Sequence, residues 1–539
     1  MMPNTSFSEN KNSFLRRLPY FFIFLFSVIL AIGMYYHEMW RDELEIYAKV
    51  GYNSDLNIGN SYAYLVYHFL MKVFLLVNDS QLMYQFYHYV IIVAAIFLLN
   101  KYSPFTLVEK FFITFSYFFF YEYGVISRHY GFMVLMVFLI LYFLSSKKIN
   151  FYLLAIPLII LANLGINALI IAFPLLLYAI NILYEKFKNK TISKKLIITY
   201  LGVFSFFILM GILYIVLTYG QKSRWDQHVA APFFMNVRTI WNVFVPLPEL
   251  SDHANFWNTN YFSFPEIYPI FTDFNLFKTT QNIVLAILSV AIFIIILIKF
   301  SKKPIVFSMF LVTYILLLLF FHAARFYYIR HQGLLFIVFI YCYWLYYIDD
   351  TEIHIPVLNR IKLDKLSRIK IDFLFKPMLA FFLISQFVSS SFAFYKDFNY
   401  KFSLSQEAAN FIKSNSLEKD HVLIGYMDYA AQAVAINLKE KIYFPQSNSV
   451  GYVWEPYEKN YNQNISMNDV LSSCIKHTEQ LNKKVVLILN TPLVDANQQQ
   501  IGGGMLTNRS KITLLRSFTG DIIQTDEQFW LYEVALIQN

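Results

Sequence analysis

Charged side chains are scarce in this sequence: they account for 15% of its 539 residues, whereas 57% are hydrophobic. Ordinary soluble domains carry about 25% charged residues, so the composition excludes a soluble globular protein and a disordered one. Glycine is also scarce, at 16 residues against 57 phenylalanines and 41 tyrosines, which excludes collagen-like and linker-like chains. The sequence therefore predicts a polytopic membrane protein.

Cysteine is almost absent, since Cys342 and Cys474 are the two in the chain. Two cysteines build neither a disulfide framework nor a cysteine-based metal site. The spacing of His228 and His253 matches no zinc pattern, so solvated loop histidines are the better interpretation. No cofactor is assigned from the sequence, and a divalent metal stays open.

Positive charge is in surplus, with 44 Lys and Arg against 35 Asp and Glu and a formal net charge of +9. Such a surplus can indicate nucleic-acid binding, but here the basic residues lie mostly in short loops between apolar runs. Membrane topology produces that placement. We therefore expect a lipid bilayer as a partner and no nucleic acid.

Apolar runs long enough to cross about 30 Å of hydrocarbon recur as far as residue 394. The first follows Arg16 and Arg17 as a secretory signal would, but it is long and lacks a good cleavage site, so we expect an uncleaved anchor. Two shorter runs lie at 62–77 and 151–162. The clear runs are 19–36, 84–99, 105–121, 130–144, 166–183, 196–219, 283–298, 305–321, 333–348 and 377–394.

Basic loops fix the expected orientation, because Lys and Arg are enriched on the cytoplasmic side of membranes. The N-terminus and the loops at 147–148, 186–195, 299–303 and 360–376 are expected inside. The loops at 37–61, 122–129, 163–166, 220–282 and 322–332, with the C-terminal part, are expected outside. This orientation needs an odd number of crossings. The run at 62–77 is short and carries His68 and Lys72, so we expect it not to span, which leaves about eleven transmembrane helices.

From Lys396 onward the composition becomes that of an ordinary soluble domain. Stretches with helical periodicity, at 404–415, 429–438 and 467–481, alternate with short strand-like runs. The expected strands are 421–425, 441–444, 485–489, 512–518 and 529–534. The alternation predicts an external α/β domain over 396–539 with a mainly parallel sheet, following a transmembrane domain over 1–395.

An acidic cluster follows the first span, in the segment from His37 to Tyr47. If residues 40–49 form an interfacial helix, Asp42, Glu45 and Lys49 share one side of it. A carboxylate held at the membrane edge beside Arg41 can act as a general base on an incoming hydroxyl. The alternative is a solvated interfacial helix of mixed charge. The residues expected to face lipid are Trp40, Leu44, Tyr47 and Ala48.

Two further clusters place arginine and histidine beside aromatic residues at the same outer face. The first contains Arg128, His129 and Tyr130, and the second contains Arg325, Arg330 and His331. A guanidinium group offers a planar fork for phosphate oxygens, and a nearby histidine adds a donor. Alternatively, these side chains simply extend to lipid headgroups. Their position on the same side as the acidic cluster favours a shared site.

These motifs together resemble the GT-C superfamily of membrane glycosyltransferases, which includes protein-mannosyltransferase-like and aminoarabinose-transferase-like bacterial enzymes. Asp42-Glu43 matches the Asp-Glu pair that these enzymes carry after the first span. The segment 37–43 is similar to the "EMWRDE" signature of a bacterial branch. Segments 127–130 and 330–333 are similar to the Arg-aromatic and Arg-His-x-Gly segments of that branch. The layout of most of the chain is also similar.

The resemblance implies a bacterial inner (cytoplasmic) membrane enzyme that uses a polyprenyl-phosphate sugar donor. Asp42, with Glu43 beside it, would take a proton from the acceptor as the acceptor attacks the sugar C1 with inversion. Arg128, Arg325 or Arg330 would stabilise the departing lipid phosphate, with Arg41, His129, Tyr130 and His331 nearby. Some members need a divalent metal and others do not. The acceptor, whether glycan, lipid or protein, and the donor sugar stay open.

Three alternatives belong to other classes. A transporter or flippase of lipid-linked glycan places ionisable residues near the midplane, whereas the expected spans here are nearly free of charge. An O-antigen-type polymerase or ligase uses Arg-rich outer loops and lacks the Asp-Glu pair. A non-catalytic relative would use its external domain to bind partners.

Overall fold

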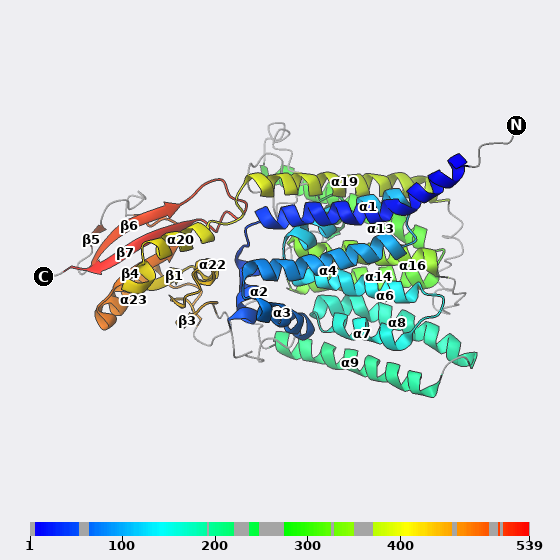
Figure 1. The fold of residues 1–539 in the computed structure, drawn as a ribbon, viewed down its shortest axis with the longest axis horizontal. Coiled ribbons are helices and arrows are strands. Elements are labelled where there is room, and N and C mark those ends of the chain that lie inside the picture. Colours follow the sequence, from blue (N-terminus) through cyan, green and yellow to red (C-terminus); the bar gives the residue numbers. More distant parts are fainter. Residues whose placement is uncertain are drawn as a thin grey trace.

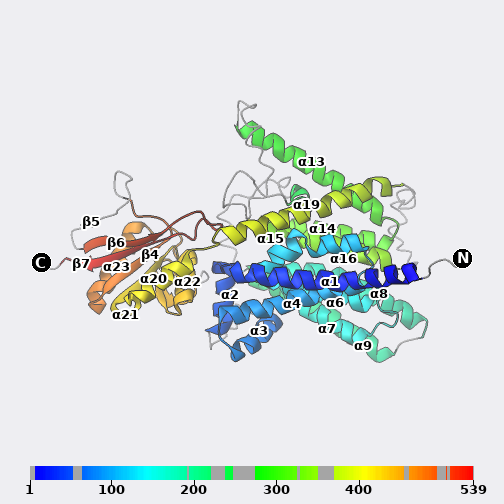
Figure 2. The same ribbon diagram turned by 45° about the horizontal axis from the view of Figure 1, so that its top comes forward.

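The computed structural model describes residues 6–52, 64–190, 193–219, 237–246, 274–324, 328–349, 370–454, 461–494, 505–506 and 510–537. A helical part and a C-terminal sheet region lie end to end along the longest axis (Figure 1). The view turned by 45° shows the same two parts, joined through α19 (Asp372–Asn399) and faced by α2 (Arg41–Gly51) (Figure 2).

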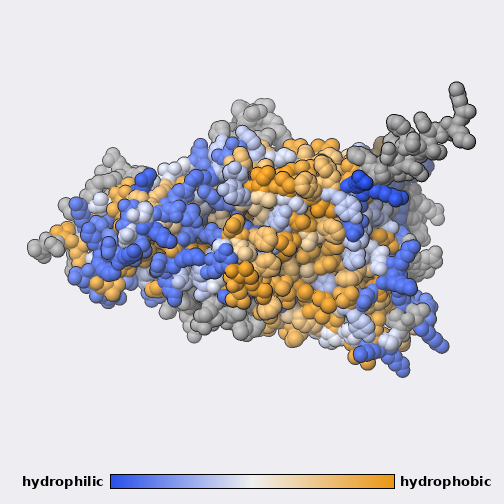
Figure 3. Space-filling model, in the orientation of Figure 1, coloured by the Kyte–Doolittle hydropathy of each residue, from blue (hydrophilic) through white to orange (hydrophobic). Residues whose placement is uncertain are grey.

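Among the described residues, eight helical segments are long and apolar enough to cross a membrane. They belong to α1 (Ser6–Tyr36), α4 (Gln81–Tyr102), α8 (Ile166–Lys188), α9 (Lys194–Tyr219), α13 (Phe274–Phe300), α14 (Pro304–Ala324), the pair α15 (Ile329–Gln332) and α16 (Leu334–Ile348), and α19. Hydrophobic residues form a broad belt over the helices, with hydrophilic residues on either side of it (Figure 3). The chain is therefore a multi-pass membrane protein.

Three shorter apolar helices complete the bundle: α3 (Leu65–Val77), α6 (His129–Leu144) and α7 (Phe151–Ala162). A helix rises about 1.5 Å per residue, so none of the three is as long as the hydrocarbon layer is thick. Helix α6 is nevertheless central, because most of its side chains are buried. The number of eleven crossings stays a prediction, as does the assignment of inside and outside.

The run at 105–121, predicted as a single span, is broken in two. Helix α5 (Leu107–Thr114) ends before Ser116, whose hydroxyl accepts a hydrogen bond from the backbone N–H of Phe119 at 3.4 Å. The chain then forms a wide π-helix, η2 (Tyr117–Val125), which is buried along its whole length. The hydroxyl at Ser116 competes with regular helix hydrogen bonding, and the wider coil carries the chain towards Arg128.

The C-terminal region is built on a seven-stranded sheet in the order β3-β2-β1-β4-β7-β6-β5. Its helices are α20 (Ser405–Ser414), α21 (Leu417–Asp420), α22 (Asp428–Leu438) and α23 (Met467–Leu481). Helices α20 and α22 share one apolar core with the sheet, and α23 shares the core on its other face. The strands are β1 (His421–Tyr426), β2 (Ile442–Phe444), β3 (Ser449–Gly451), β4 (Lys484–Leu489), β5 (Met505–Leu506), β6 (Ser510–Phe518) and β7 (Phe529–Leu536).

The five predicted strands are confirmed, but the prediction of a mainly parallel sheet is wrong. Strand β1 is parallel to β2 and β4, whereas the β2–β3, β4–β7, β6–β7 and β5–β6 pairs are antiparallel. A parallel neighbour needs a long crossover, usually a helix, and β6 and β7 are joined by a short connection without one. That connection, residues 519–528, reaches the helical part.

Gly333 allows η2 to pack closely against the junction of α15 and α16. A Cβ atom at this position would lie 2.3 Å from the ring of Phe118 and 2.4 Å from the hydroxyl of Tyr123. The same Tyr123 hydroxyl donates a hydrogen bond to the backbone carbonyl of Arg330 at 2.8 Å. The close approach therefore holds Arg330 in place.

We expect Gly333→Ala to destabilise the protein by about 1–3 kcal/mol through this overlap, although alanine is the better helix former. Thermal unfolding of the purified protein in detergent measures the effect. The matched control is Gly202→Ala in α9, where nothing lies within 4 Å of an added Cβ. Equal melting temperatures for the two variants would contradict the packing argument.

Candidate functional site

Helix α2 lies between the helical part and the C-terminal region. It begins after Trp40, whose backbone N–H donates to Glu43 Oε2 at 3.4 Å. Contacts with α3, α4 and α22 enclose it. The expected helix at 40–49 is confirmed, but the expectation that one face meets lipid is wrong, because that face packs inside the protein. The side chains concerned are Trp40, Leu44, Tyr47 and Ala48, all at most 1% exposed.

Asp42 meets two arginines that are distant in sequence. Its Oδ2 lies 3.1 Å from Arg128 Nη1 and 3.5 Å from Arg330 Nη2. The Asp42 side chain is 22% exposed, so the cluster is accessible from one side. Burial alone raises the pKa of Asp42, but Arg128 and Arg330 outweigh that effect and hold the pKa below its ordinary value. We call Arg128 and Arg330 the arginine pair.

Aromatic rings support the arginine pair. The Trp40 ring centroid lies 5.8 Å from the Arg128 guanidinium carbon and 5.5 Å from that of Arg330. Arg128 also lies 5.5 Å from the Tyr130 ring, and Arg330 lies 4.4 Å from the Tyr328 ring. These cation–π contacts fix two long side chains and lower the entropy lost when they bind an anion.

Glu43 turns away from Asp42 and has different partners. It is fully buried, and its Oε2 lies 2.8 Å from His37 Nε2. Its Oε1 accepts a short hydrogen bond from the backbone N–H of Ser127, the residue before Arg128. The Asp-Glu pair of the sequence is thus divided in space. Asp42 faces the arginine pair, and Glu43 ties the start of α2 to the segment that carries Arg128.

His37 connects Glu43 to the end of α19. Its Nδ1 lies 2.8 Å from Asp397 Oδ2, which also accepts a hydrogen bond from the Tyr121 hydroxyl at 3.2 Å. Burial alone lowers the pKa of His37, but Asp397 and Glu43 outweigh it and hold that pKa well above its ordinary value. His37 is therefore a buried cation between two carboxylates.

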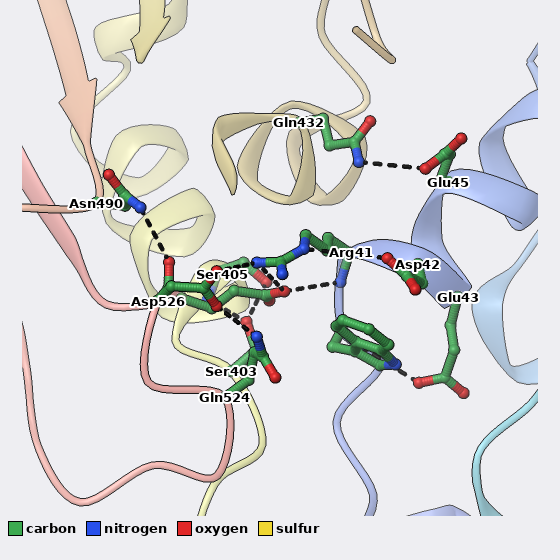
Figure 4. Close-up of polar contacts among 12 residues, drawn as sticks. Arg41, Asp42, Glu43, Glu45, Ser403, Ser405, Gln432, Asn490, Gln524 and Asp526 are labelled. Carbon is green, nitrogen blue, oxygen red and sulfur yellow. Dashed lines mark hydrogen bonds and ion pairs between the residues drawn. The ribbon is translucent and has the colours of Figure 1, made fainter. Parts of the chain in front are cut away.

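Arg41 reaches the C-terminal region (Figure 4). Its Nη1 lies 2.7 Å from Asp526 Oδ2, and its backbone N–H donates to Glu527 Oε1 at 3.1 Å. The guanidinium carbon also lies 4.8 Å from the Tyr429 ring centroid. Its Nε is 4.0 Å from Asp42 Oδ1, so Arg41 borders the site but gives its strongest contacts to the 519–528 connection.

The other predicted site residues that the structure describes, His129, Tyr130 and His331, contact one another next to the arginine pair. The Tyr130 hydroxyl is 2.8 Å from His331 Nδ1, and both side chains are buried. The His129 ring packs at a tilt against the rings of Tyr64 and Tyr130, with centroid distances of 4.4 and 4.3 Å. Arg325 lies outside the described residues, as do most of the predicted 220–282 loop and the end of the 37–61 loop.

Sequence reasoning gave no role to His37, Asp397, Asp526 or Glu527. His37 stands within the acidic cluster, and its place directly after the first span was a usable signal. Asp397 is 360 residues away from its partner, so no local pattern indicates the contact. Among the described residues, no group of three or more His, Cys, Asp and Glu side chains is arranged to hold a metal ion.

Comparison with known proteins adds no identity: no family model matches the chain, and no curated protein sequence matches it.

Removing the His37 cation leaves two carboxylates facing each other without a counter-charge, so we expect His37→Gln to destabilise the protein by about 3–5 kcal/mol. Because the pKa of folded His37 lies above its unfolded value near 6.5, its contribution is complete below pH 6.5. The contribution is lost as the pH rises through the folded pKa. The difference in melting temperature between wild type and His37→Gln should therefore be largest at pH 6 and shrink above neutral pH.

The matched control is His421→Gln in β1, where the histidine has one carboxylate partner, Glu533 at 3.0 Å, and is partly exposed. We expect a smaller loss of melting temperature for this variant. A pH-independent difference for His37→Gln would show that His37 contributes by packing and not by charge.

Proposed function

We propose that the chain is a membrane glycosyltransferase that moves a sugar from a polyprenyl-phosphate donor to an extracytoplasmic acceptor. The observation that carries this proposal is the convergence of Asp42 and the arginine pair on one partly open site. Helix α2, which carries Asp42, lies at the end of the helical part beside the C-terminal region (Figure 1). This position suits an enzyme that joins a lipid-anchored donor to a polar acceptor. The similarity of the Asp-Glu and arginine motifs to those of GT-C enzymes supports the same class.

Charge balance at the site supports a phosphodiester ligand. Among the ion pairs within 4 Å in the described part of the chain, the two arginines of the pair share the single carboxylate of Asp42, so their direct contacts balance one of the two positive charges. A polyprenyl-phosphate sugar carries one negative charge on its phosphodiester, which matches the other positive charge. Two guanidinium groups also supply the parallel N–H donors that phosphate oxygens accept.

The proposed reaction is a single displacement. An acceptor hydroxyl attacks C1 of the sugar, its proton passes to Asp42, and the bond between C1 and the phosphate oxygen breaks. Polyprenyl phosphate leaves with one more negative charge than the diester, and the arginine pair stabilises that added charge. Attack opposite the leaving group inverts the anomeric centre.

Donor binding also prepares the base. In the structure the arginine pair lowers the pKa of Asp42. A phosphate that takes over these guanidinium donors weakens their hold on Asp42 and adds a neighbouring negative charge. Both effects raise the proton affinity of the carboxylate, which makes Asp42 a stronger base once the donor is present.

Native mass spectrometry of the purified protein in detergent tests the donor. We expect a polyprenyl phosphate or its glycosylated form to be retained, and Arg128→Ala and Arg330→Ala to lower its occupancy about tenfold or more, as loss of a charge-assisted hydrogen bond predicts. Arg516→Ala on β6, which lies against Phe411 and Phe518, is the control and should leave occupancy unchanged. Retention of bulk phospholipid alone, even after addition of the donor, would contradict the proposal and favour a transporter.

Asp42→Asn and Glu43→Gln should have different effects. Asp42→Asn removes the general base, so we expect consumption of the polyprenyl-phosphate sugar in the presence of cell-envelope acceptors to fall about 10²–10⁴-fold while the donor still binds. Glu43→Gln weakens the contacts to His37 and Ser127, so we expect a lower melting temperature. Full turnover by Asp42→Asn would exclude Asp42 as the base.

A further inference from the structure

A second polar site lies beside the first, between the helical part and the C-terminal region. It is a cavity of about 170 Å³, bordered by the segment 37–39, the start of α4, the start of α20 and the end of α22. The arginine pair and Asp42 are not part of its lining. The segment 37–39 leads directly into α2, so the cavity adjoins the proposed catalytic site without sharing its charged groups.

Carboxamide and hydroxyl groups dominate the lining of the cavity. Gln81 Nε2 donates to Asn437 Oδ1 at 2.7 Å, and Asn437 Nδ2 donates to Ser405 Oγ at 3.0 Å. This chain of hydrogen bonds joins α4, α22 and α20 across the cavity. Gln85 and Gln406 add two further carboxamides, whose Nε2 atoms each donate one hydrogen bond, to the Met34 carbonyl at 3.1 Å and to Asn410 Oδ1 at 3.0 Å. A carboxamide nitrogen carries two N–H groups and its oxygen is an acceptor, so these side chains combine donors and acceptors as adjacent ligand hydroxyls require.

Glu38 supplies one carboxylate oxygen that accepts no hydrogen bond. This atom, Oε2, is buried, whereas the carboxylate as a whole accepts a hydrogen bond from the backbone of Ser403 and has Oε1 3.9 Å from Lys401 Nζ. A buried carboxylate oxygen without a donor is unfavourable, and a ligand hydroxyl would satisfy it. The other ionisable group in the lining, His37, already directs both ring nitrogens to Glu43 and Asp397.

The lining excludes other ligand classes. None of the described residues that line the cavity is a lysine or an arginine, and the His37 cation in the lining is already balanced by Glu43 and Asp397. An anionic ligand would therefore meet the negative charge of Glu38, which Lys401 approaches only to 3.9 Å. The cavity is smaller than the roughly 300–1,000 Å³ of pockets that hold drug-sized ligands, so it accommodates one ring and not an oligosaccharide. An uncharged ligand with several hydroxyl groups fits both its size and its donors and acceptors.

We propose that this cavity is a carbohydrate-binding site that takes one uncharged sugar residue of the acceptor. Its role as an acceptor subsite rests on the proposed function, whereas sugar binding by the cavity stands independently of it. Because the segment 37–39 borders the cavity and leads into α2, a glycan bound here by one sugar residue would have Asp42 on the adjoining helix. The acceptor is then a glycan or glycolipid.

Ligand-observed saturation-transfer NMR on the full chain in detergent tests the proposal without using transfer activity. The probes are glucose, galactose, mannose, rhamnose, arabinose, N-acetylglucosamine and N-acetylgalactosamine. We expect at least one to bind saturably, and its dissociation constant to rise tenfold or more in both Glu38→Gln and Gln406→Ala. Gln480→Ala, a substitution of the same type on the exposed side of α23, should bind like wild type.

Each outcome decides a separate question. Absence of saturable binding for all seven sugars, or equal affinity in wild type, Glu38→Gln and Gln406→Ala, would overturn the cavity proposal. Melting temperatures identify a variant that fails to fold, and the other variant then carries the test. Asp42→Asn should bind the sugar normally. Sugar binding that depends on Glu38 and Gln406, in a protein that never consumes the lipid-linked donor, would reject the proposed function but keep the cavity as a sugar site.

Discussion

A buried histidine cation between two carboxylates holds the site together. His37 joins Glu43 at the start of α2 to Asp397 at the end of α19, with both contacts at 2.8 Å. Glu43 in turn holds the backbone of Ser127. The start of α2, the end of α19 and the segment before α6 are remote in sequence, and His37 and Glu43 join them. We infer that these contacts fix the direction of α2, which carries Asp42. In such a buried group each charge is stable only while the others are present.

The membrane explains why the ionic groups of the candidate site lie at the end of the helical part and not within it. Charged side chains are costly in hydrocarbon, and the belt in Figure 3 is accordingly apolar. Asp42, Arg41 and the arginine pair lie where the helical part meets the C-terminal region. There Asp526 and Glu527 of the 519–528 connection bind Arg41. The connection between β6 and β7 thus positions a residue of α2, and the C-terminal region forms one wall of the site.

Local patterns in the sequence predicted those features that local physics determines. Apolar runs predicted helices, and the alternation after residue 396 predicted five strands. The shared outer face predicted that Asp42, Arg128 and Arg330 come together. Contacts between distant segments were beyond such patterns: the burial of α2 depends on its contacts with α3, α4 and α22, and the position of the Arg41 side chain depends on Asp526. The break before η2 was missed because η2 is a run of aromatic and apolar residues apart from Glu122, and the capping residue Ser116 precedes it.

The contacts of Asp42 also suggest the order of steps in the proposed reaction, with donor binding before deprotonation of the acceptor. Without an anion, the arginine pair keeps the carboxylate a weak base, so water near the site is poorly activated. In the proposed reaction, the phosphate of the sugar donor would draw the guanidinium groups away from Asp42 and so make it a stronger base. The base would then become active only when the electrophilic sugar carbon is also bound, so that the acceptor is deprotonated where it can react. The two neighbouring acidic residues therefore have different roles. Glu43 binds His37 and Ser127 and holds the site together. Asp42 binds the arginine pair and, in the proposed reaction, exchanges these contacts for the acceptor proton.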